Sequence, residues 1–471
     1  MYVERITLEN YKGFEQAEIE FSRADGQFAG WHVLAGRNGA GKSSVLMALA
    51  LALRAENYAF RLLPDFDGEL RALADHGKIL VRLVCDPKND QFDDLTSFFH
   101  APAEWHGPHY PLPPDPEDGD DPRNEPPPEM LELGMELSRR RNKLVMASPI
   151  TTPDFNDVQS WPKRGPWRAE AGTGWMIAGY GPQRRLQGHS NRAFELMRQS
   201  SGVASLVTLF YEDASLAEAT VWLRELSQAS PQMAQDLLDL LNDGLMPDGM
   251  VAKRLDEDGL LIVEQAGLEL PLERLSDGYR AVAALVFDII YRLATAYGRR
   301  AVTLDRSGGP MTINCSGVVL IDEPETHLHP NWQKRLGFWL VAHFPNLQFI
   351  VTTHSPFICQ AALHGSLIRL SPPGDARPPG RLEGDDYWTV VNGSPNDAML
   401  TNLFGLDRLI SDESEQLRET IAALDAKDME STLSGIEAEE LEQARAKLPN
   451  RGSAELDRFR RIIEGMAGRE G

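Results

Sequence analysis

Residues 36–43 of this chain read GRNGAGKS, and few short sequences restrict a fold so tightly. They match the pattern G-x-x-x-x-G-K-[ST], whose glycines let backbone N–H groups surround phosphate oxygens. The stretch follows a strand-like segment, Trp31–Leu34, and precedes an Ala- and Leu-rich segment typical of a buried helix. This order predicts an α/β nucleotide-binding domain in which Lys42 reaches the β and γ phosphates and the Ser43 hydroxyl binds Mg²⁺. The residues expected to contact ATP here are Gly36, Arg37, Asn38, Gly39, Ala40, Gly41, Lys42, Ser43 and Ser44.

Composition narrows the class of protein. The chain has 471 residues and 42% hydrophobic residues, enough for two or three structural units with a sizeable core. Its formal charge of -23 argues against a protein that coats nucleic acid through its overall field. No apolar segment has the length of a membrane span, and the N-terminal residues lack the apolar region of a secretory signal. Three scattered cysteines indicate neither disulfides nor a cysteine metal site, so we expect a cytoplasmic protein.

The rest of the chain alternates between strands, helices and one unusual insertion. Residues 2–8 and Ala17–Phe21 predict strands of an opening sheet that also contains Trp31–Leu34. Prolines and acidic residues fill the segment 101–130, which predicts a disordered or extended insertion, with a docking segment as the alternative. Later strands are predicted at Leu260–Val263, Val318–Ile321, Phe349–Thr352 and, before the glutamine-containing turn, Trp175–Ala178.

We therefore divide the chain into five parts. Residues 1–100 form the first half of the nucleotide-binding domain, and 101–130 form the insertion. Residues 131–260 form a part that is helical and contains the glutamine-bearing turn, with Ser230 and Pro231 starting a new helix, and 261–390 form the second half of the domain. A helical tail, 391–471, opens with a helix capped by Ser394 and Pro395 and continues with one-sided apolar faces. These faces contain Leu417, Ile421 and Leu424, and then Leu456, Phe459 and Ile463.

Two adjacent carboxylates, Asp322 and Glu323, follow the apolar run Val318–Ile321. Burying neighbouring like charges is unfavourable unless a cation or polar ligand faces them. A Mg²⁺ held by Asp322 and Ser43 would supply that cation, and Glu323 would then orient or deprotonate the attacking water. If the pair instead capped the following helix, capping would account for one carboxylate and not for both.

A second anion-binding helix start occurs at LSDGYR, residues 275–280, which precedes an apolar helix. One nucleotide does not need two such helix ends from one chain. Taken together, the motifs resemble those of ABC-class ATPases of the SMC, RecF and OLD type. GRNGAGKS stands where that family has Walker A, LSDGYR where it has its signature, LIDEPE where it has Walker B, and TTHSP, residues 352–356, where it has the histidine switch.

The resemblance implies an α/β fold, namely an ABC-class P-loop ATPase head with a mixed sheet and flanking helices, a helical insertion and a small helical C-terminal unit. It also implies a dimer around ATP and Mg²⁺, in which Ser276 and Gly278 of one subunit close on the nucleotide of the other. Glu323, His354 and Lys42 would be catalytic, although His354 taken alone suits a structural role. Lys12 would lie near the nucleotide.

Several side chains keep more than one interpretation. Gln183 would touch Mg²⁺ or the attacking water, but a contact of Arg184 or Arg185 with phosphate is equally consistent with the sequence. His327 and His329 suit the family pattern better than a metal site, because no third ligand accompanies them at a suitable spacing.

The subtype follows from what the sequence lacks. Sustained heptads are missing, which excludes SMC-like coiled-coil arms, and the second acidic motif of a TOPRIM nuclease is missing too. An OLD-like ATPase without its own nuclease resembles the PtuA family of Septu-type anti-phage systems. That resemblance implies an assembly of at least two copies, with an HNH nuclease as partner and possible DNA binding. Basic clusters at residues 139–143, 184–185, 299–300 and 458–461 would contact that DNA, and the alternative is that they form solvated helix faces and helix ends. The alternative is a RecF-like DNA repair ATPase without a nuclease partner, whereas the intact Glu323 disfavours a scaffold that binds ATP without turnover.

Overall fold

The computed structural model comprises two compact units, residues 1–405 and 406–471. It describes residues 1–54, 59–63, 68–86, 90, 130–140, 143–152, 174–184, 195–197, 201–246, 249–372, 375, 377–406, 411–430 and 432–447. The proline-rich segment, apart from Met130, and the predicted face with Leu456, Phe459 and Ile463 lie outside these residues. Among the described helices, none combines the length and hydrophobicity needed to cross a bilayer.

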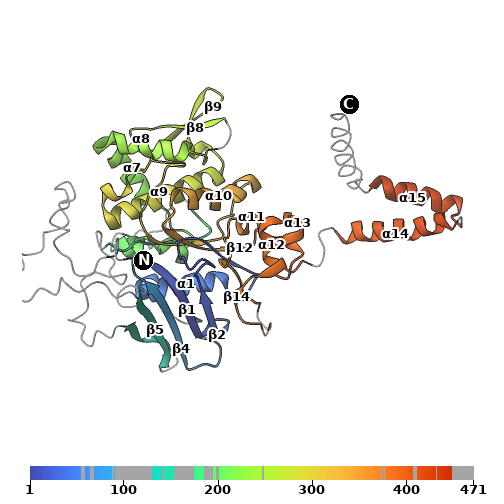
Figure 1. Cartoon of the computed structure of the whole chain (residues 1–471), viewed down its shortest axis with the longest axis horizontal. Helices are drawn as coiled ribbons and strands as arrows, with labels where there is room; N and C mark the ends of the chain where they lie inside the picture. Colours follow the sequence, from blue (N-terminus) through green and yellow to red (C-terminus); the bar gives the residue numbers. More distant parts are fainter. Residues whose placement is uncertain are drawn as a thin grey trace, which may run out of the picture. The chain divides into compact units, whose positions relative to one another are not determined.

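A six-stranded sheet forms the centre of the first unit (Figure 1). Its order is β14-β13-β3-β12-β11-β7, and all neighbours are parallel except β13 and β14. Strands β3, β7, β11 and β12 are buried along their whole length, as expected for parallel strands covered on both faces. The strands are β3 (Gly30–Ala35), β7 (Ile177–Tyr180), β11 (Gly317–Asp322), β12 (Leu347–Thr353), β13 (Leu367–Arg369) and β14 (Gly380–Arg381).

A five-stranded antiparallel sheet, ordered β2-β1-β4-β5-β6, lies beside it. Its strands are β1 (Tyr2–Tyr11), β2 (Phe14–Glu20), β4 (His76–Val84), β5 (Met130–Arg140) and β6 (Lys143–Thr152). The prediction that Trp31–Leu34 belongs to this opening sheet was wrong. That segment is β3, which is buried on both faces, whereas β4 alternates between buried and half-buried residues. The mostly helical character expected from residue 131 was also wrong for β5 and β6, because β5 pairs with β4 across the proline-rich segment.

Helix α1 (Lys42–Leu53) lies between the two sheets, contacting β4 and β5 on one side and β11 and β12 on the other. Its residues from Val45 to Leu53 are buried, apart from a half-buried Met47. An amphipathic sequence would leave one face of this helix without apolar contacts, so the all-round hydrophobicity of residues 45–53 matches its position.

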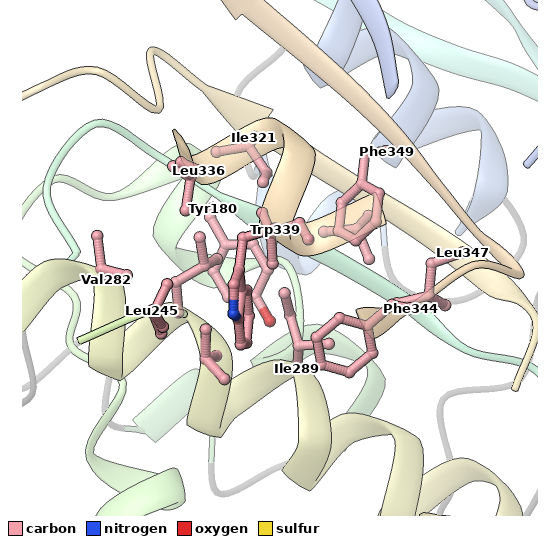
Figure 2. Packing of buried hydrophobic residues seen from close by; sticks show 14 of the residues in the cluster. Tyr180, Leu245, Val282, Ile289, Ile321, Leu336, Trp339, Phe344, Leu347 and Phe349 are labelled. Atoms are coloured by element: carbon pink, nitrogen blue, oxygen red, sulfur yellow. The ribbon is translucent and has the colours of Figure 1, made fainter. Parts of the chain in front are cut away.

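The central sheet has a hydrophobic core on each face. One contains α1, and four other helices of the first unit belong to the core on the opposite face. They are α7 (Ala217–Ala229), α8 (Pro231–Asn242), α9 (Asp277–Tyr297) and α10 (Pro330–His343). Trp339 of α10 lies among Tyr180, Leu245 and Ile289 in this core (Figure 2), and its Nε1 donates a hydrogen bond of 2.7 Å to the Asp243 carbonyl. A separate three-stranded sheet contains β8 (Met250–Leu255), β9 (Leu261–Gln265) and β10 (Leu268–Pro271).

Short helices complete the first unit, and two longer ones form the second. In the first unit these are α2 (Ala59–Leu62), α5 (Ser201–Ala204), α6 (Val207–Phe210), α11 (Pro356–Cys359), α12 (Gly384–Asn392) and α13 (Pro395–Met399), with 3₁₀ turns at Leu272–Arg274 and Arg299–Val302. Ser394 caps α13 as predicted, but α13 belongs to the first unit rather than to a separate tail. The second unit contains α14 (Asp412–Met429) and α15 (Gly435–Lys447). On α14, Leu424 is buried while Leu417 and Ile421 are half-buried.

Candidate nucleotide site

The carboxyl ends of four parallel strands bring the predicted motifs to one edge of the central sheet. Asp322 on β11 is paired with Thr352 on β12, and Thr353 is paired with Ala35, which directly precedes the phosphate loop, residues 36–43. On the other side of β11, Tyr180 at the end of β7 is paired with Ile321. The edge therefore carries the phosphate loop, the histidine switch, the paired carboxylates and the glutamine-containing turn, in that order.

The phosphate loop has the backbone that its glycines predict. Gly39 and Gly41 have φ values of 79° and 84°, in the left-handed region that favours glycine. A Cβ atom on Gly41 would also lie 2.6 Å from the Phe14 ring, so this glycine is required by packing as well. Helix α1 begins at Lys42, within the last two residues of the loop, and its first N–H groups have no partners earlier in the helix. This is a geometry that binds anions.

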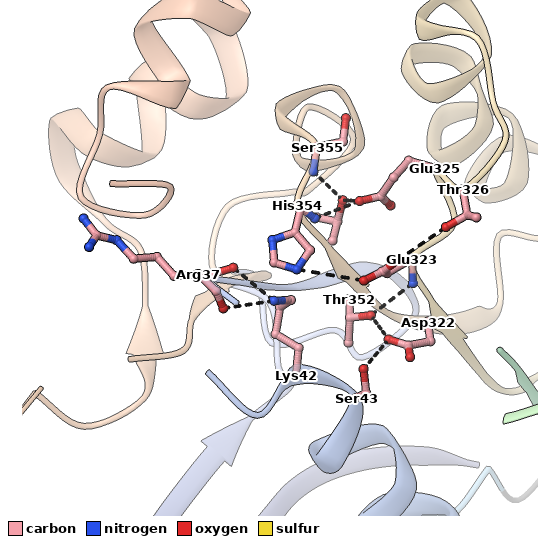
Figure 3. Close-up of polar contacts among 12 residues, drawn as sticks. Arg37, Lys42, Ser43, Asp322, Glu323, Glu325, Thr326, Thr352, His354 and Ser355 are labelled. Carbon is pink, nitrogen blue, oxygen red and sulfur yellow. Dashed lines mark hydrogen bonds and ion pairs between the residues drawn. The ribbon is translucent and has the colours of Figure 1, made fainter. Parts of the chain in front are cut away.

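The Lys42 side chain lies within the loop, where Nζ donates hydrogen bonds to the carbonyls of Gly36 (3.1 Å) and Arg37 (3.2 Å) (Figure 3). Burial lowers the pKa of Lys42, while the nearby carboxylates of Glu323 and Asp322 oppose that effect. The Arg37 side chain points away from Lys42, and its Nη2 donates a hydrogen bond of 2.8 Å to the Gly405 carbonyl. We expect Arg37 to contribute to phosphate binding through its backbone.

The residues present fit a magnesium ion. Ser43 Oγ lies 3.0 Å from Asp322 Oδ1, to which it donates a hydrogen bond, and both groups are oxygen ligands of the kind Mg²⁺ prefers. The described part of the chain holds no cluster of three or more His, Cys, Asp or Glu side chains suited to a metal. Mg²⁺ typically takes one or two protein ligands and completes its octahedron with substrate phosphates and water, so this small set is sufficient.

Glu323 occupies a sharp corner directly after β11. Its φ of 46° is unusual for a residue with a side chain, and its N–H donates a hydrogen bond of 3.1 Å to Thr352 Oγ1. The Thr352 hydroxyl in turn donates to Asp322 Oδ1, so one threonine joins the two carboxylate residues. Glu323 Oε1 lies 3.9 Å from His354 Nε2, and both side chains are about one third exposed (Figure 3). Burial and the Lys42 charge lower the pKa of His354, while the Glu323 and Asp322 carboxylates act in the opposite direction.

Glu325 connects the same corner to the histidine switch, a role that the sequence did not predict. Its Oε1 accepts hydrogen bonds from Thr353 Oγ1 (2.6 Å) and from the His354 N–H (2.7 Å). Its other oxygen, Oε2, is buried without a hydrogen-bond partner among the described residues, and burial raises the pKa of this carboxyl. The sequence signal for this role was the pair Thr352 and Thr353 at the end of β12. Their hydroxyl groups can donate hydrogen bonds to acidic residues at the end of the neighbouring strand.

The signature residues lie at the start of α9. Ser276 is exposed and precedes the helix without a capping hydrogen bond from its side chain. Gly278 is buried against the segment after Walker B, where a Cβ atom would lie 2.7 Å from the His327 carbonyl. Any larger residue at position 278 would therefore displace the tip of α9 from that segment.

Other predicted residues have partners that limit their roles. Lys12 Nζ forms an ion pair of 3.1 Å with Glu69, so a contact with nucleotide would require Lys12 to leave that pair. Gln183 is half-buried in the turn after β7, close in sequence to Arg184, whose guanidinium contacts backbone carbonyls. Arg185 and the side chains of Arg139, Arg140 and Arg300 lie outside the described residues, as do residues 458–461, so the DNA contact stays a prediction.

Two family models match the chain and include both halves of this site. One, described as an AAA ATPase domain, matches residues 1–101, which contain the phosphate loop. The other is described as an AAA domain, putative AbiEii toxin, Type IV TA system, and matches residues 183–360, which contain the signature, the paired carboxylates and His354. Together with the mixed sheet and its flanking helices, they confirm the predicted ATPase head.

Two named proteins and one solved structure illustrate what the chain is similar to. The chain is 22% identical over 369 residues to the Septu protein PtuA of Bacillus mycoides, a match that covers 78% of this chain and 40% of PtuA. It is 40% identical over 99 residues to the Retron Ec83 probable ATPase of Escherichia coli, covering 21% of this chain and 17% of that protein. The match to each of these relatives thus covers less than half of that relative's length. An SMC head domain from Thermotoga maritima aligns over 82% of this chain and all of that structure, with 14% identity and a TM-score of 0.40.

Proposed function

We propose that this chain, which matches models of AAA ATPase domains and is similar to PtuA, hydrolyses ATP and controls a partner nuclease in anti-phage defence. The observation that carries the ATPase part is the contact between Ser43 and Asp322, which joins the phosphate loop to the paired carboxylates. A bound magnesium ion would neutralise charge on the phosphates in front of these two residues.

The chain's own groups divide the work of hydrolysis. The N–H groups of the phosphate loop and the Lys42 ammonium bind the phosphates. Glu323 accepts a proton from the attacking water, since its side chain is partly exposed and is held at the corner beside the loop. The imidazole of His354 lies beside Glu323, where it can donate a hydrogen bond to the γ-phosphate.

The dimer is proposed from the exposed tip of α9. Ser276 is exposed at this helix start, and Gly278 is packed against His327. The tip therefore places the Ser276 hydroxyl and the amino-terminal end of α9 at the surface, which suits the phosphates of a nucleotide held by a second copy. ATP would join the two copies and its hydrolysis would release them.

Replacing Ser276 with arginine tests this arrangement. We expect Ser276→Arg to bind ATP as a monomer with unchanged affinity, because the phosphate loop is intact, and to lose both dimerisation and turnover. Light scattering with and without Mg–ATP, together with phosphate release, measures the two effects. Ser411→Arg, at an exposed serine that caps α14 in the second unit, introduces the same side chain elsewhere and should bind ATP, dimerise and turn over as the wild type does. Normal turnover in Ser276→Arg would eliminate a site made by two chains.

The nuclease partner is tested by co-expression. We expect this chain to copurify with a small HNH endonuclease encoded by a neighbouring gene, and we expect the nuclease activity of the complex to change with ATP. The alternative, a RecF-like repair ATPase, predicts instead that the chain purifies alone and that its ATPase responds to DNA ends or gaps. A scaffold would show neither a nuclease activity that changes with ATP nor an ATPase activity that responds to DNA.

A further inference from the structure

Arg184 is a buried arginine in the turn after β7, and its side chain reaches across to β11. It is 5% exposed. Its Nη1 donates hydrogen bonds to the carbonyls of Gly181 (3.0 Å) and Asp322 (3.2 Å). Its Nη2 donates to the carbonyls of Glu323 (3.3 Å) and Pro324 (3.0 Å). One guanidinium thus binds three consecutive carbonyls of the segment that contains the proposed base.

This contact coincides with a strained backbone. Glu323 has a φ of 46°, a conformation that is unfavourable for a residue with a side chain and persists only where surrounding contacts hold it. Its N–H is held by Thr352 Oγ1, and its carbonyl and those of both neighbours are held by Arg184. The planar fork of five N–H donors is the side-chain group best suited to several carbonyls at once.

The charge of Arg184 is retained in spite of its burial. Burial lowers the pKa of this guanidinium to about 10, while Glu325, Asp322 and Glu323 act in the opposite direction. At pH 7 the group is therefore cationic and surrounded by the acidic residues of the site. The sequence left open whether Arg184 contacts phosphate, but in the structure its guanidinium donates these four hydrogen bonds to backbone carbonyls.

We infer that Arg184 is a positioning residue, which holds the backbone corner at Glu323 and thereby aims the Glu323 carboxylate at the attacking water. The inference rests on the proposed role of Glu323 as the base. In this inference Arg184 acts only through the segment whose carbonyls it binds. Arg184, in the turn after β7, and Thr352, on β12, approach the corner from the two sides of β11. We call these two residues the clamp.

Two substitutions at Arg184 test the inference by kinetics. Arg184→Lys keeps the charge but loses the fork, and Arg184→Gln loses both. We expect kcat to fall about 10- to 100-fold in each, because small misplacements of a catalytic group cost up to about two orders of magnitude, while the KM and Kd for ATP change less than about twofold. Arg254→Gln, at an exposed arginine that pairs with Glu269, controls for loss of a positive charge. An unchanged kcat would overturn the inference, and so would a parallel loss of ATP affinity, which would indicate a phosphate contact.

A double-mutant cycle separates positioning from general structural support. In the Glu323→Gln background, Arg184→Lys should cause no further loss of turnover, because the group that it positions is already inactive. Independent, multiplicative losses would show that Arg184 acts elsewhere. Arg184→Lys also carries the test if Arg184→Gln fails to fold.

Hydrogen exchange provides a readout that does not depend on hydrolysis. Amides of the peptide 321–326 should exchange at least about fivefold faster in Arg184→Lys than in the wild type, while those of β12 stay unchanged. If the wild type shows no ATPase activity, the proposed function fails, but faster exchange in this peptide would still establish the clamp. Unchanged exchange would refute the clamp whatever the activity.

Discussion

Replacing Lys42 with alanine is expected to abolish ATP binding at concentrations that saturate the wild type. Lys42 Nζ lies within the phosphate loop, where it is held by the carbonyls of Gly36 and Arg37, and burial already weakens its hydration. Removing one partner of a buried, charged contact costs about 2–5 kcal/mol, which corresponds to roughly 30- to 4,000-fold in affinity. Titration with a fluorescent ATP analogue measures the loss.

The control for Lys42→Ala is Lys253→Ala, at an exposed lysine on β8 that pairs with Glu264. It removes the same charge at a position far in the sequence from the residues predicted to contact ATP. The affinity for ATP should therefore stay unchanged. Thermal melting of both variants without nucleotide shows whether they are folded. An ATP affinity of Lys42→Ala within about twofold of the wild type would mean that residues 36–43 form a structural turn and not a phosphate site.

Replacing Glu323 with glutamine is expected to give the opposite phenotype, with ATP bound normally and hydrolysed very slowly. The amide has the size of the carboxylate but cannot accept a proton, and loss of a general base typically lowers turnover by about 10²- to 10⁴-fold. The backbone corner should survive, because Thr352 and Arg184 hold it through main-chain groups. ATP should therefore trap the dimer, which light scattering detects.

Glu257→Gln, at an exposed loop position, is the matched control and should leave turnover and oligomeric state unchanged. Two results would count against the proposed role of Glu323. One is wild-type turnover in Glu323→Gln, which would require another base. The other is slow turnover without an ATP-dependent dimer, which would separate hydrolysis from assembly.

The sequence predicts best those features that depend on neighbouring residues. The phosphate loop, the strand before Asp322 and the cap at Ser394 all follow from short patterns with a local physical cause. The pairing of β4 with β5 does not, because the intervening residues carry no signal for a sheet that continues beyond them. Likewise β3 resembles the earlier strands in composition, and only burial on both faces assigns it to the other sheet.

Side-chain direction is the other limit of prediction. The sequence places Arg184 near the site, but its choice of backbone carbonyls over phosphate depends on how the turn after β7 is oriented. Lys12 is a similar case, because Glu69, which pairs with it, is far away in the sequence. Glu325 follows the paired carboxylates directly, yet its bond to the His354 N–H depends on the register between β11 and β12.

The position of α1 between two sheets has a consequence for the order of events during synthesis. A helix that is apolar all round gains little stability before its partners exist, and the partners of α1 include β5 and β12. Until the ribosome has completed the chain up to residue 353, the side of α1 that contacts β11 and β12 must stay exposed or be shielded by a chaperone. Premature termination before β12 would therefore yield a fragment that is prone to aggregation. In co-translational pulse labelling, the amides of α1 should become fully protected from exchange only after β12 has been synthesised.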